Sequence, residues 1–455
     1  MTEADATAPR SEPVDIETFL DNVKFSAFHW RVMLIGAMAM LVDGFDLGVL
    51  SWVLPMVSDD FGVERTDLTW VLSMQMAGMV LGAYFIAPIA DQIGRKRLLI
   101  YCLLAVSACC FVTIFTQTVW QLAIARLVTG MFASAVIANM VALSSELAPA
   151  RKRSTMVTIV LAGSMPGAIL GSLMQAFLLE PFGWHIAFYI GAALPLILVP
   201  VMITLLPESP KFIATRDPKD PRLLAILAEL NPNNDPITIA PRQVTEKRQG
   251  GFTLVKDLFA PGLALPTILL WLGFISSFAF ISAATWKTTV FRDLVGLEWH
   301  AVGITTGIGV IFGAVGMVTI GMVIDRFGFK AIVPSYFLIA SAAAIGMAIF
   351  APGWGMYVAL AINAAAQHAA HAGLASIAST LYPTRNRATG VGWAYGAGRA
   401  ASTIGPFYGA LALDQNWGAL GYFLLLAAPL ASAGLVILFL LTVKPLTTIG
   451  RATAH

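Results

Sequence analysis

The sequence predicts an all-α membrane protein whose twelve transmembrane helices form two repeats of six. Three observations support this fold class. Of the 455 residues, 58% are hydrophobic and only 12% are charged, which is about half the charged share of a soluble globular domain. Twelve stretches are long and apolar enough to cross a bilayer, which takes about 20 residues. Two loop motifs also recur at one fixed spacing, as a duplicated half of the chain would give.

The twelve apolar stretches are divided by a single long polar segment after the sixth. We therefore expect an N-terminal segment, a six-helix bundle, a linker, a second six-helix bundle and a tail. The expected limits of these regions are 1–30, 31–206, 207–261, 262–443 and 444–455. Within the linker, Arg222 to Leu230 is predicted to form one short helix. The expected spans are 32–52, 68–90, 98–117, 119–143, 154–178, 184–206, 263–286, 300–323, 331–351, 354–381, 388–412 and 418–442.

Lys and Arg residues are distributed unevenly over the expected loops. The termini, the linker and the loops on the same side contain 23 of the 28, and the opposite side receives Arg65 and Arg292. Because positively charged loops stay in the cytoplasm, both termini are expected there. The acidic N-terminal segment lacks a basic n-region, so no cleaved signal peptide is expected. The other three basic residues, Arg126, Lys287 and Arg399, fall inside spans or at their edges.

Composition and missing motifs disfavour several other classes of protein. The net charge of +2 gives no basic excess for binding nucleic acid. No GxSxG, HExxH or phosphate-binding loop is found, which argues against a membrane enzyme. His368 and His371 have a spacing compatible with a metal pair, but no acidic or thiol ligand stands near them in the sequence. We predict polar packing or substrate contact for these histidines, and neither a metal nor a cofactor.

Two loop motifs indicate an internal repeat. The loop Asp91–Lys96 reads DQIGRK and the loop Asp325–Lys330 reads DRFGFK, 234 residues later. The segments Ser145–Thr155 and Ser379–Thr389 also match, again 234 residues apart. Parallel repeats of six helices place a substrate path between the two halves. An alternating-access carrier is therefore the leading prediction.

These loops and the six-plus-six layout resemble the major facilitator superfamily over essentially the whole chain. More narrowly, the sequence DGFD at Asp43–Asp46, the run Tyr382–Trp393 and the pair Gly398–Arg399 resemble the aromatic acid:proton symporter family, which includes transporters of 4-hydroxybenzoate, protocatechuate and benzoate. The resemblance implies the major facilitator fold and proton-coupled import of a hydroxybenzoate-type aromatic carboxylate. We expect a multi-pass protein of the cytoplasmic (inner) membrane that works as a monomer in the lipid bilayer.

Other functions stay open at this point. The chain could transport another organic acid or an oxyanion. The small-residue stripe Gly163, Gly167 and Gly171 loosely resembles a glycine motif of drug:proton antiporters. A receptor that binds the acid without transporting it is also compatible with the sequence.

Asp43 and Asp46 are the candidate proton-coupling residues. Three residues apart on one helix, they share a face, and an ionised carboxylate inside the membrane is costly unless it meets water or a partner. Two neighbouring carboxylates also suppress each other's ionisation, so one should hold a proton more readily. The alternative is that one aspartate only caps or hydrogen-bonds a broken helix.

Arg126 and Arg399 are the candidate anion-binding residues, because an arginine inside a span keeps its charge and needs an anion. Their positions in the other repeat are Leu360 and Met165, so the fold alone does not demand them. We favour Arg399 as the bidentate dock of the substrate carboxylate and Arg126 as the partner of the aspartates. The alternative is that both arginines form structural ion pairs between helices.

Further candidate substrate contacts are aromatic or at the edge of a span. Phe45, Trp393 and Tyr395 could stack on a ring-bearing substrate, although such residues are also common in membrane-protein cores and interfaces. His368 is a fourth candidate. For Lys287 we predict that the long side chain extends to the membrane interface; the alternative is that it meets an anion at the outer mouth.

The repeated cytoplasmic loops are expected to act in gating rather than in substrate choice. By resemblance, they latch the inward side when the carrier faces outward, with Arg153 and Arg387 as expected partners of the loop aspartates. The predicted gating residues are Asp91, Gly94, Arg95, Glu146, Arg153, Asp325, Gly328 and Arg387.

Overall fold

The computed structural model describes residues 16–217, 219–230, 255–383 and 386–444. Within these ranges the regular elements are helices, and none is a strand. The expectations for the chain ends (1–15 and 445–455), for most of the central linker (231–254) and for residues 384–385 lie outside the described residues.

Each of the first six expected spans contains a long helix or two consecutive ones. The fifth span is two helices because the chain is interrupted at Gly163. The first span continues past its expected end at residue 52 to Phe61, where Gly62 in the left-handed conformation (φ 63°) ends the helix. The helices of this half are α2 (Ala27–Phe61), α3 (Thr69–Phe85), α5 (Arg95–Thr113), α6 (Val119–Leu147), α7 (Arg153–Ala162), α8 (Ser164–Phe177) and α10 (His185–Leu205), with the short α4 (Ala90–Ile93) and α9 (Leu179–Phe182).

The six expected spans of the second half also contain long helices. The first of them is followed by a tight turn, one short helix and a π-helical turn at Val290–Leu294. The helices of this half are α14 (Ala264–Ala283), α15 (Lys287–Thr289), α16 (Trp299–Phe327), α17 (Phe329–Ile349), α18 (Trp354–Leu381), α19 (Arg387–Asp414) and α20 (Gly418–Val443).

Ten helical segments of the described chain are both long and apolar enough to cross a membrane. The remaining two long helices, α18 and α19, have 28 residues each but lower hydropathy. Their sequences are rich in Ala and Gly and include Asn363, Gln367, two histidines and Arg399. Polar residues inside a bundle usually serve a function. These two helices are therefore candidates for lining a functional surface between the halves.

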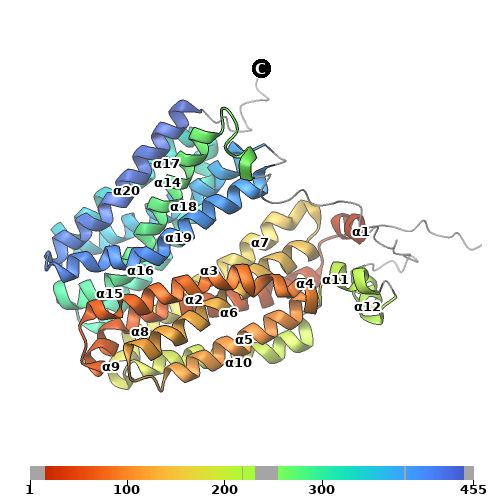
Figure 1. Cartoon of the computed structure of the whole chain (residues 1–455), viewed down its shortest axis with the longest axis horizontal. Helices are drawn as coiled ribbons and strands as arrows, with labels where there is room; N and C mark the ends of the chain where they lie inside the picture. The colour runs from red at the N-terminus through yellow and green to blue at the C-terminus, as the bar shows by residue number, and fades with distance from the viewer. Residues whose placement is uncertain (1–15, 218, 231–254, 384–385, 445–455) are drawn as a thin grey trace, which may run out of the picture.

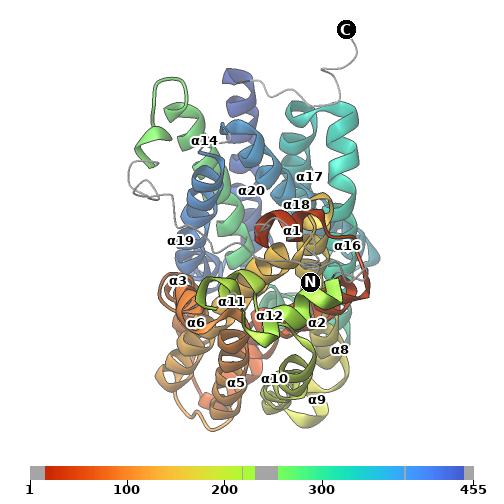
Figure 2. The same cartoon turned by 90° about the vertical axis from the view of Figure 1, so that its right-hand side faces the viewer.

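The two six-helix bundles lie at an angle and meet at one end (Figure 1). In this view the first half lies below and the second half above, close together where α8, α15 and α16 lie and farther apart towards α1 (Ile16–Asn22). Contacts between the halves are made by α8 with α16, α3 with α19, and α2 with α15. Figure 2 looks onto the divergent end, where α1, α11 (Pro210–Arg216) and α12 (Pro221–Leu230) lie.

The short helix expected in the linker is present as α12, and it buries one apolar face. Leu223, Ile226 and Leu227 form this face and pack in the same core cluster as the first half. An ion pair of 2.9 Å between Arg31 and Glu229 also joins α2 to α12. The described part of the linker is therefore attached to the first bundle.

The two repeated loops turn through glycines that no other residue replaces easily. Gly94 has φ 100° and Gly328 has φ 84°, values that favour glycine because it lacks a Cβ atom. Gly94 is also confined, because a Cβ atom there would lie 2.3 Å from a carboxylate oxygen of Glu208. The matched positions thus share a backbone conformation, but among the described residues only Gly94 has a close neighbour.

Candidate functional site

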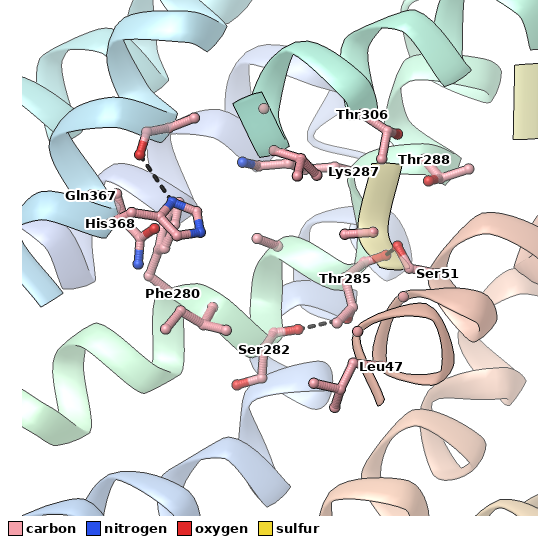
Figure 3. A pocket seen from close by; sticks show the side chains of 18 of the residues that line it. Leu47, Ser51, Phe280, Ser282, Thr285, Lys287, Thr288, Thr306, Gln367 and His368 are labelled. Atoms are coloured by element: carbon pink, nitrogen blue, oxygen red, sulfur yellow. Dashed lines mark hydrogen bonds between the residues drawn. The ribbon is translucent and has the colours of Figure 1, made fainter. Parts of the chain in front are cut away.

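A cavity of about 540 Å³ lies between the two halves. Helices α2, α3 and α8 of the first half and α14, α15, α16, α18 and α19 of the second half contribute to its wall (Figure 3). Much of this wall is apolar, and four of its side chains are aromatic: Trp52, Phe278, Phe280 and Phe291.

The charged residues of the cavity wall are cationic. Lys287 and Arg399 line it, and none of the described lining residues is Asp or Glu. Since a buried cation needs an anion or strong hydrogen-bond acceptors, this cavity is suited to an anion with an apolar body.

Arg399 lies on α19 and lines the cavity. Its neighbour Gly398 packs so tightly on Phe278 that a Cβ atom there would lie 2.3 Å from the ring. This close contact fixes the position of the helix beside the cavity. Among the described residues, no carboxylate lies within ion-pair distance of the Arg399 guanidinium. The N–H donors of the Arg399 guanidinium are therefore available to bind a ligand.

Lys287 does not extend to the membrane interface, so that prediction is wrong. Its side chain lines the cavity, with Nζ 3.5 Å from Oδ1 of Asn363 and 5.1 Å from the centre of the Phe280 ring. The turn after α14 directs the side chain inward, which sequence position alone did not reveal. In Figure 3 it extends towards the side of the cavity where Gln367 and His368 lie.

His368 lines the cavity and His371 does not. Nδ1 of His368 lies 2.9 Å from the carbonyl oxygen of Ala364. Because a carbonyl only accepts, Nδ1 carries the hydrogen and Nε2 of the neutral ring is an acceptor. His371 lies behind the wall, with Nδ1 2.9 Å from Oγ of Ser277. Among the described residues, no cluster of three metal-ligating side chains is found.

The three aromatic candidates do not line the cavity. Phe45 is buried and packs edge-on against Trp52, with ring centres 5.6 Å apart. Tyr395 packs against Phe274 at 4.8 Å. Trp393 stacks on Trp271 at 5.9 Å and is 46% exposed. Packing determines which face of each helix is turned towards the cavity, and a single sequence does not reveal this. Other aromatic rings therefore line the cavity.

Asp46 and Arg126 form a fully buried ion pair behind the cavity wall. Arg126 Nη1 donates to Asp46 Oδ1 at 2.9 Å, and neither side chain is more than 5% exposed. Gln75 donates to Asp46 Oδ2 at 3.3 Å, and the guanidinium lies 5.1 Å from the centre of the Phe188 ring. Arg126 does not line the cavity, and its charge is neutralised within the first half.

Asp43 is buried without such a partner. The residue is 7% exposed, and its Oδ1 is buried with no hydrogen-bond partner among the described residues. Electrostatic interactions reach it from Asp46 and from Arg399. The next residue, Gly44, lines the cavity, so an unpaired carboxyl group lies directly behind the cavity wall.

The halves are joined by polar contacts at the end where they meet. Ser51 donates to the carbonyl oxygen of Thr285. Gln175 donates to Thr288 at 3.3 Å and accepts from Thr306 at 2.8 Å. These contacts close the cavity at this end.

An ion-pair cluster lies beyond these contacts at the same end. Arg65 binds Asp59 of its own half at 2.7 Å and Asp293 of the other half at 2.9 Å. Among the described residues, this is where an ion pair crosses between the halves; the remaining ion pairs involve only the first half, the N-terminal segment and the linker.

The predicted gating residues lie at the opposite, divergent end. Arg95 binds Glu146 at 2.7 Å and approaches the exposed Asp91 at 3.7 Å. Glu146 also accepts a 2.6 Å hydrogen bond from Ser209 of the linker. The first repeated loop is thereby tied to its own half and to the linker.

The expected pairing of Arg153 with the loop aspartate does not occur in this conformation. Arg153 binds Asp21 of α1 instead, a residue distant in the sequence. In the second half, Asp325 and Arg387 are exposed and form no ion pair with a described residue. The repeat positions of Arg95 and Glu146 are Phe329 and Thr380, so the second loop lacks the charged pair of the first.

The sequence analysis does not name several uncharged polar residues of the site, among them Gln75, Gln175 and Asn363. Gln75 holds Asp46, Gln175 joins the halves, and Asn363 faces Lys287. Each is an amide side chain within an apolar span, which was the signal available.

Two bundles around one central, cation-lined cavity, closed at one end, define a membrane transport protein. The model of the Major Facilitator Superfamily matches residues 36–362 and 300–453, and the chain belongs to this family.

Several characterised relatives match over nearly the whole chain. A gallate transporter of Pseudomonas putida is 30% identical, over 94% of this chain and 96% of its own. The 4-hydroxybenzoate transporter PcaK of Pseudomonas aeruginosa is 29% identical, over 90% and 92%. Among solved structures, a D-xylose-proton symporter has a TM-score of 0.70 at 17% identity, covering 90% of this chain and 97% of that one. An inward-open form of the xylose transporter XylE has a TM-score of 0.71. These two structures support the fold.

Proposed function

We propose that this protein is a proton-coupled symporter that imports an aromatic carboxylate, of the hydroxybenzoate type, by alternating access. The observation that supports this most is the cavity: its wall holds two cations, aromatic rings and, among the described residues, no carboxylate. Such a wall suits an anion with a flat apolar ring. The relatives named above, which transport gallate and 4-hydroxybenzoate, agree with this substrate class.

In this proposal Arg399 docks the substrate carboxylate with two parallel hydrogen bonds. His368 contributes to the same cavity wall. Phe45 and Tyr395 act through their neighbours, since they pack against rings that line the cavity. Trp393, which stacks on Trp271 away from the cavity, is not given a substrate contact.

The two aspartates have different parts in the proposal. Asp46 is neutralised by Arg126 and holds the helices of the first half together. Asp43 Oδ1 has no hydrogen-bond partner among the described residues, and burying an unpaired charge is costly, so this carboxyl group is the one that binds and releases the coupled proton. Arg399 interacts electrostatically with Asp43, so it responds to whether the Asp43 carboxyl group is ionised.

The conformation is proposed to be inward-facing. The linker and α1, which the charge distribution assigns to the cytoplasm, lie at the divergent end, and the closed end is then extracellular. The proposed location is the cytoplasmic membrane, with bundles 31–206 and 262–443 joined by the linker 207–261. Because one chain supplies both walls of the cavity, the working unit is a monomer.

The gating residues keep their expected role in this scheme. Asp91, Gly94, Arg95, Glu146 and Arg153 of the first half form the latch together with the linker. Asp325, Gly328 and Arg387 supply the weaker counterpart in the second half. In this scheme the two groups of gating residues join the halves when the carrier faces outward.

The test is uptake of labelled 4-hydroxybenzoate into proteoliposomes with an alkaline interior. We expect accumulation that collapses with a protonophore, and competition by benzoate and gallate but not by succinate or xylose. Equal competition by succinate would point instead to a general organic-acid carrier. Proton-driven export of cationic drugs without acid uptake would point to an antiporter.

A further inference from the structure

Four polar residues gather on one side of the cavity, around Lys287. Asn363, Gln367 and His368 come from α18, within two helical turns, and all four line the cavity. Figure 3 shows Lys287, Gln367 and His368. Nζ of Lys287 lies 3.5 Å from Asn363 Oδ1, and its charge acts electrostatically on His368. In Figure 3 the Lys287 side chain extends towards the side of the cavity where His368 lies.

The hydrogen-bonding capacity of this group is not used up within the protein. Lys287 has three donors, and its one polar contact with a described residue is the long one to Asn363. The amide nitrogen of Asn363 is already committed to the carbonyl oxygen of Ala340 at 2.7 Å. Nδ1 of His368 donates to the carbonyl oxygen of Ala364, which leaves Nε2 as an acceptor. The group thus presents a cationic donor beside a neutral acceptor.

A hydroxyl group matches this pair, because it accepts one hydrogen bond and donates another. A carboxylate fits less well, since it only accepts and would face the lone pair of His368 Nε2. A bare ring edge leaves both protein groups without partners, and buried polar groups that lose a partner weaken binding strongly.

We propose that Lys287 and His368 form a hydroxyl-binding subsite that makes the carrier prefer aromatic acids with a ring hydroxyl. This rests on the proposed function, in which Arg399 docks the carboxylate. The hydroxyl oxygen accepts from Lys287 Nζ, and its hydrogen is donated to His368 Nε2. Lys287 is then a specificity-determining residue rather than a general anion trap.

The first experiment compares the Kd of 4-hydroxybenzoate with that of benzoate on the purified full chain by calorimetry. We expect Lys287→Met to lower the preference for the hydroxylated acid by roughly tenfold or more, with little change in benzoate binding. His368→Phe should lower the same preference. Lys219→Met, at an exposed lysine in the linker, is the matched control and should behave as wild type.

Two results would overturn the assignment. If Lys287→Met weakens the binding of both acids equally, the lysine binds the carboxylate and does not recognise the hydroxyl group. If the preference is unchanged, Lys287 takes no part in recognition. Thermal unfolding of each variant shows whether a lost preference comes from a damaged fold.

A second probe separates this inference from the proposed function. Phenol has the hydroxyl but no carboxylate, and its binding is followed by saturation-transfer NMR. We expect a signal that Lys287→Met abolishes and Arg399→Gln keeps. If wild type binds phenol in this way but no aromatic acid, the proposed function fails and the subsite stands. A phenol signal that persists in Lys287→Met, or no phenol signal in wild type, contradicts the subsite.

Discussion

Ser51 and Thr285, which touch where the two halves meet, are separated by 234 residues, the spacing of the internal repeat. The two residues are therefore equivalent positions of the duplicated halves, and they lie against each other beside the cavity. Arg65 shows the same relation farther out, because its partners Asp59 and Asp293 are also 234 residues apart. The closed end is thus formed around equivalent segments, the C-terminal part of α2 and the stretch from Thr285 to Asp293 that follows α14.

The Arg65 cluster allows a matched test of this closed end. Asp293→Asn removes the ion pair between the halves, and Asp59→Asn removes only the pair within one half. Partly exposed pairs contribute about 0.2–1 kcal/mol, so Asp293→Asn should open this end a few-fold more often. Asp59→Asn should leave the opening unchanged.

Distances between spin labels placed on the loops at this end measure the opening. Equal distance distributions in the two variants would show that the ion pair between the halves does not hold this end closed.

Asp43 and Asp46 should give different defects when changed to Asn. Asp46→Asn leaves Arg126 charged, fully buried and without its anion, which costs about 3–5 kcal/mol and should lower the unfolding temperature clearly. Asp43→Asn removes no ion pair, so its stability should stay near wild type while accumulation driven by a pH gradient is lost.

Thermal unfolding and uptake assays on the same samples check both expectations. A strongly destabilised Asp43→Asn, or an Asp46→Asn as stable as wild type, would contradict the pairing described here.

Arg399→Lys should weaken binding of the aromatic acid although it keeps the positive charge. A lysine cannot form the two parallel hydrogen bonds of a guanidinium, so we expect roughly a tenfold rise in Kd. The measurement is calorimetric titration with 4-hydroxybenzoate, with Arg216→Lys on the linker as control. An unchanged Kd would rule out bidentate docking at Arg399.

Gly94→Ala and Gly328→Ala should differ in stability although both have positive φ. Each substitution strains the backbone by roughly 1–3 kcal/mol, but only the alanine at 94 also meets the Glu208 carboxylate. We expect the lower unfolding temperature for Gly94→Ala, with partial recovery when Glu208→Ala is added. The same unfolding temperature in the two single variants would show that the Glu208 contact is easily relieved.

Much of the fold could be predicted from the sequence, because hydropathy and helix length are set by the membrane and because the repeat is visible in the loops. The charges inside the spans could also be picked out, since Asp43, Asp46, Arg126 and Arg399 are costly there. Which of these charges pair could not be predicted, because pairing depends on how the helices rotate and pack. Arg126 meets Asp46 and leaves Asp43 alone.

Side-chain direction at helix ends was the least predictable feature. Lys287 was expected at the interface and lies in the cavity, because the tight turn after α14 redirects its side chain. Arg153 was expected to meet a loop aspartate and meets Asp21, a partner 132 residues away. Both outcomes depend on contacts between distant segments, which one sequence does not display.

The most direct test of the central claim is the pH of a weakly buffered medium outside proteoliposomes when 4-hydroxybenzoate is added without a starting gradient. A symporter takes up protons with the acid, so the external pH should rise with the wild-type protein. It should not rise with Asp43→Asn or with protein-free liposomes. Uptake of labelled acid by the wild type with no change in external pH would contradict proton coupling.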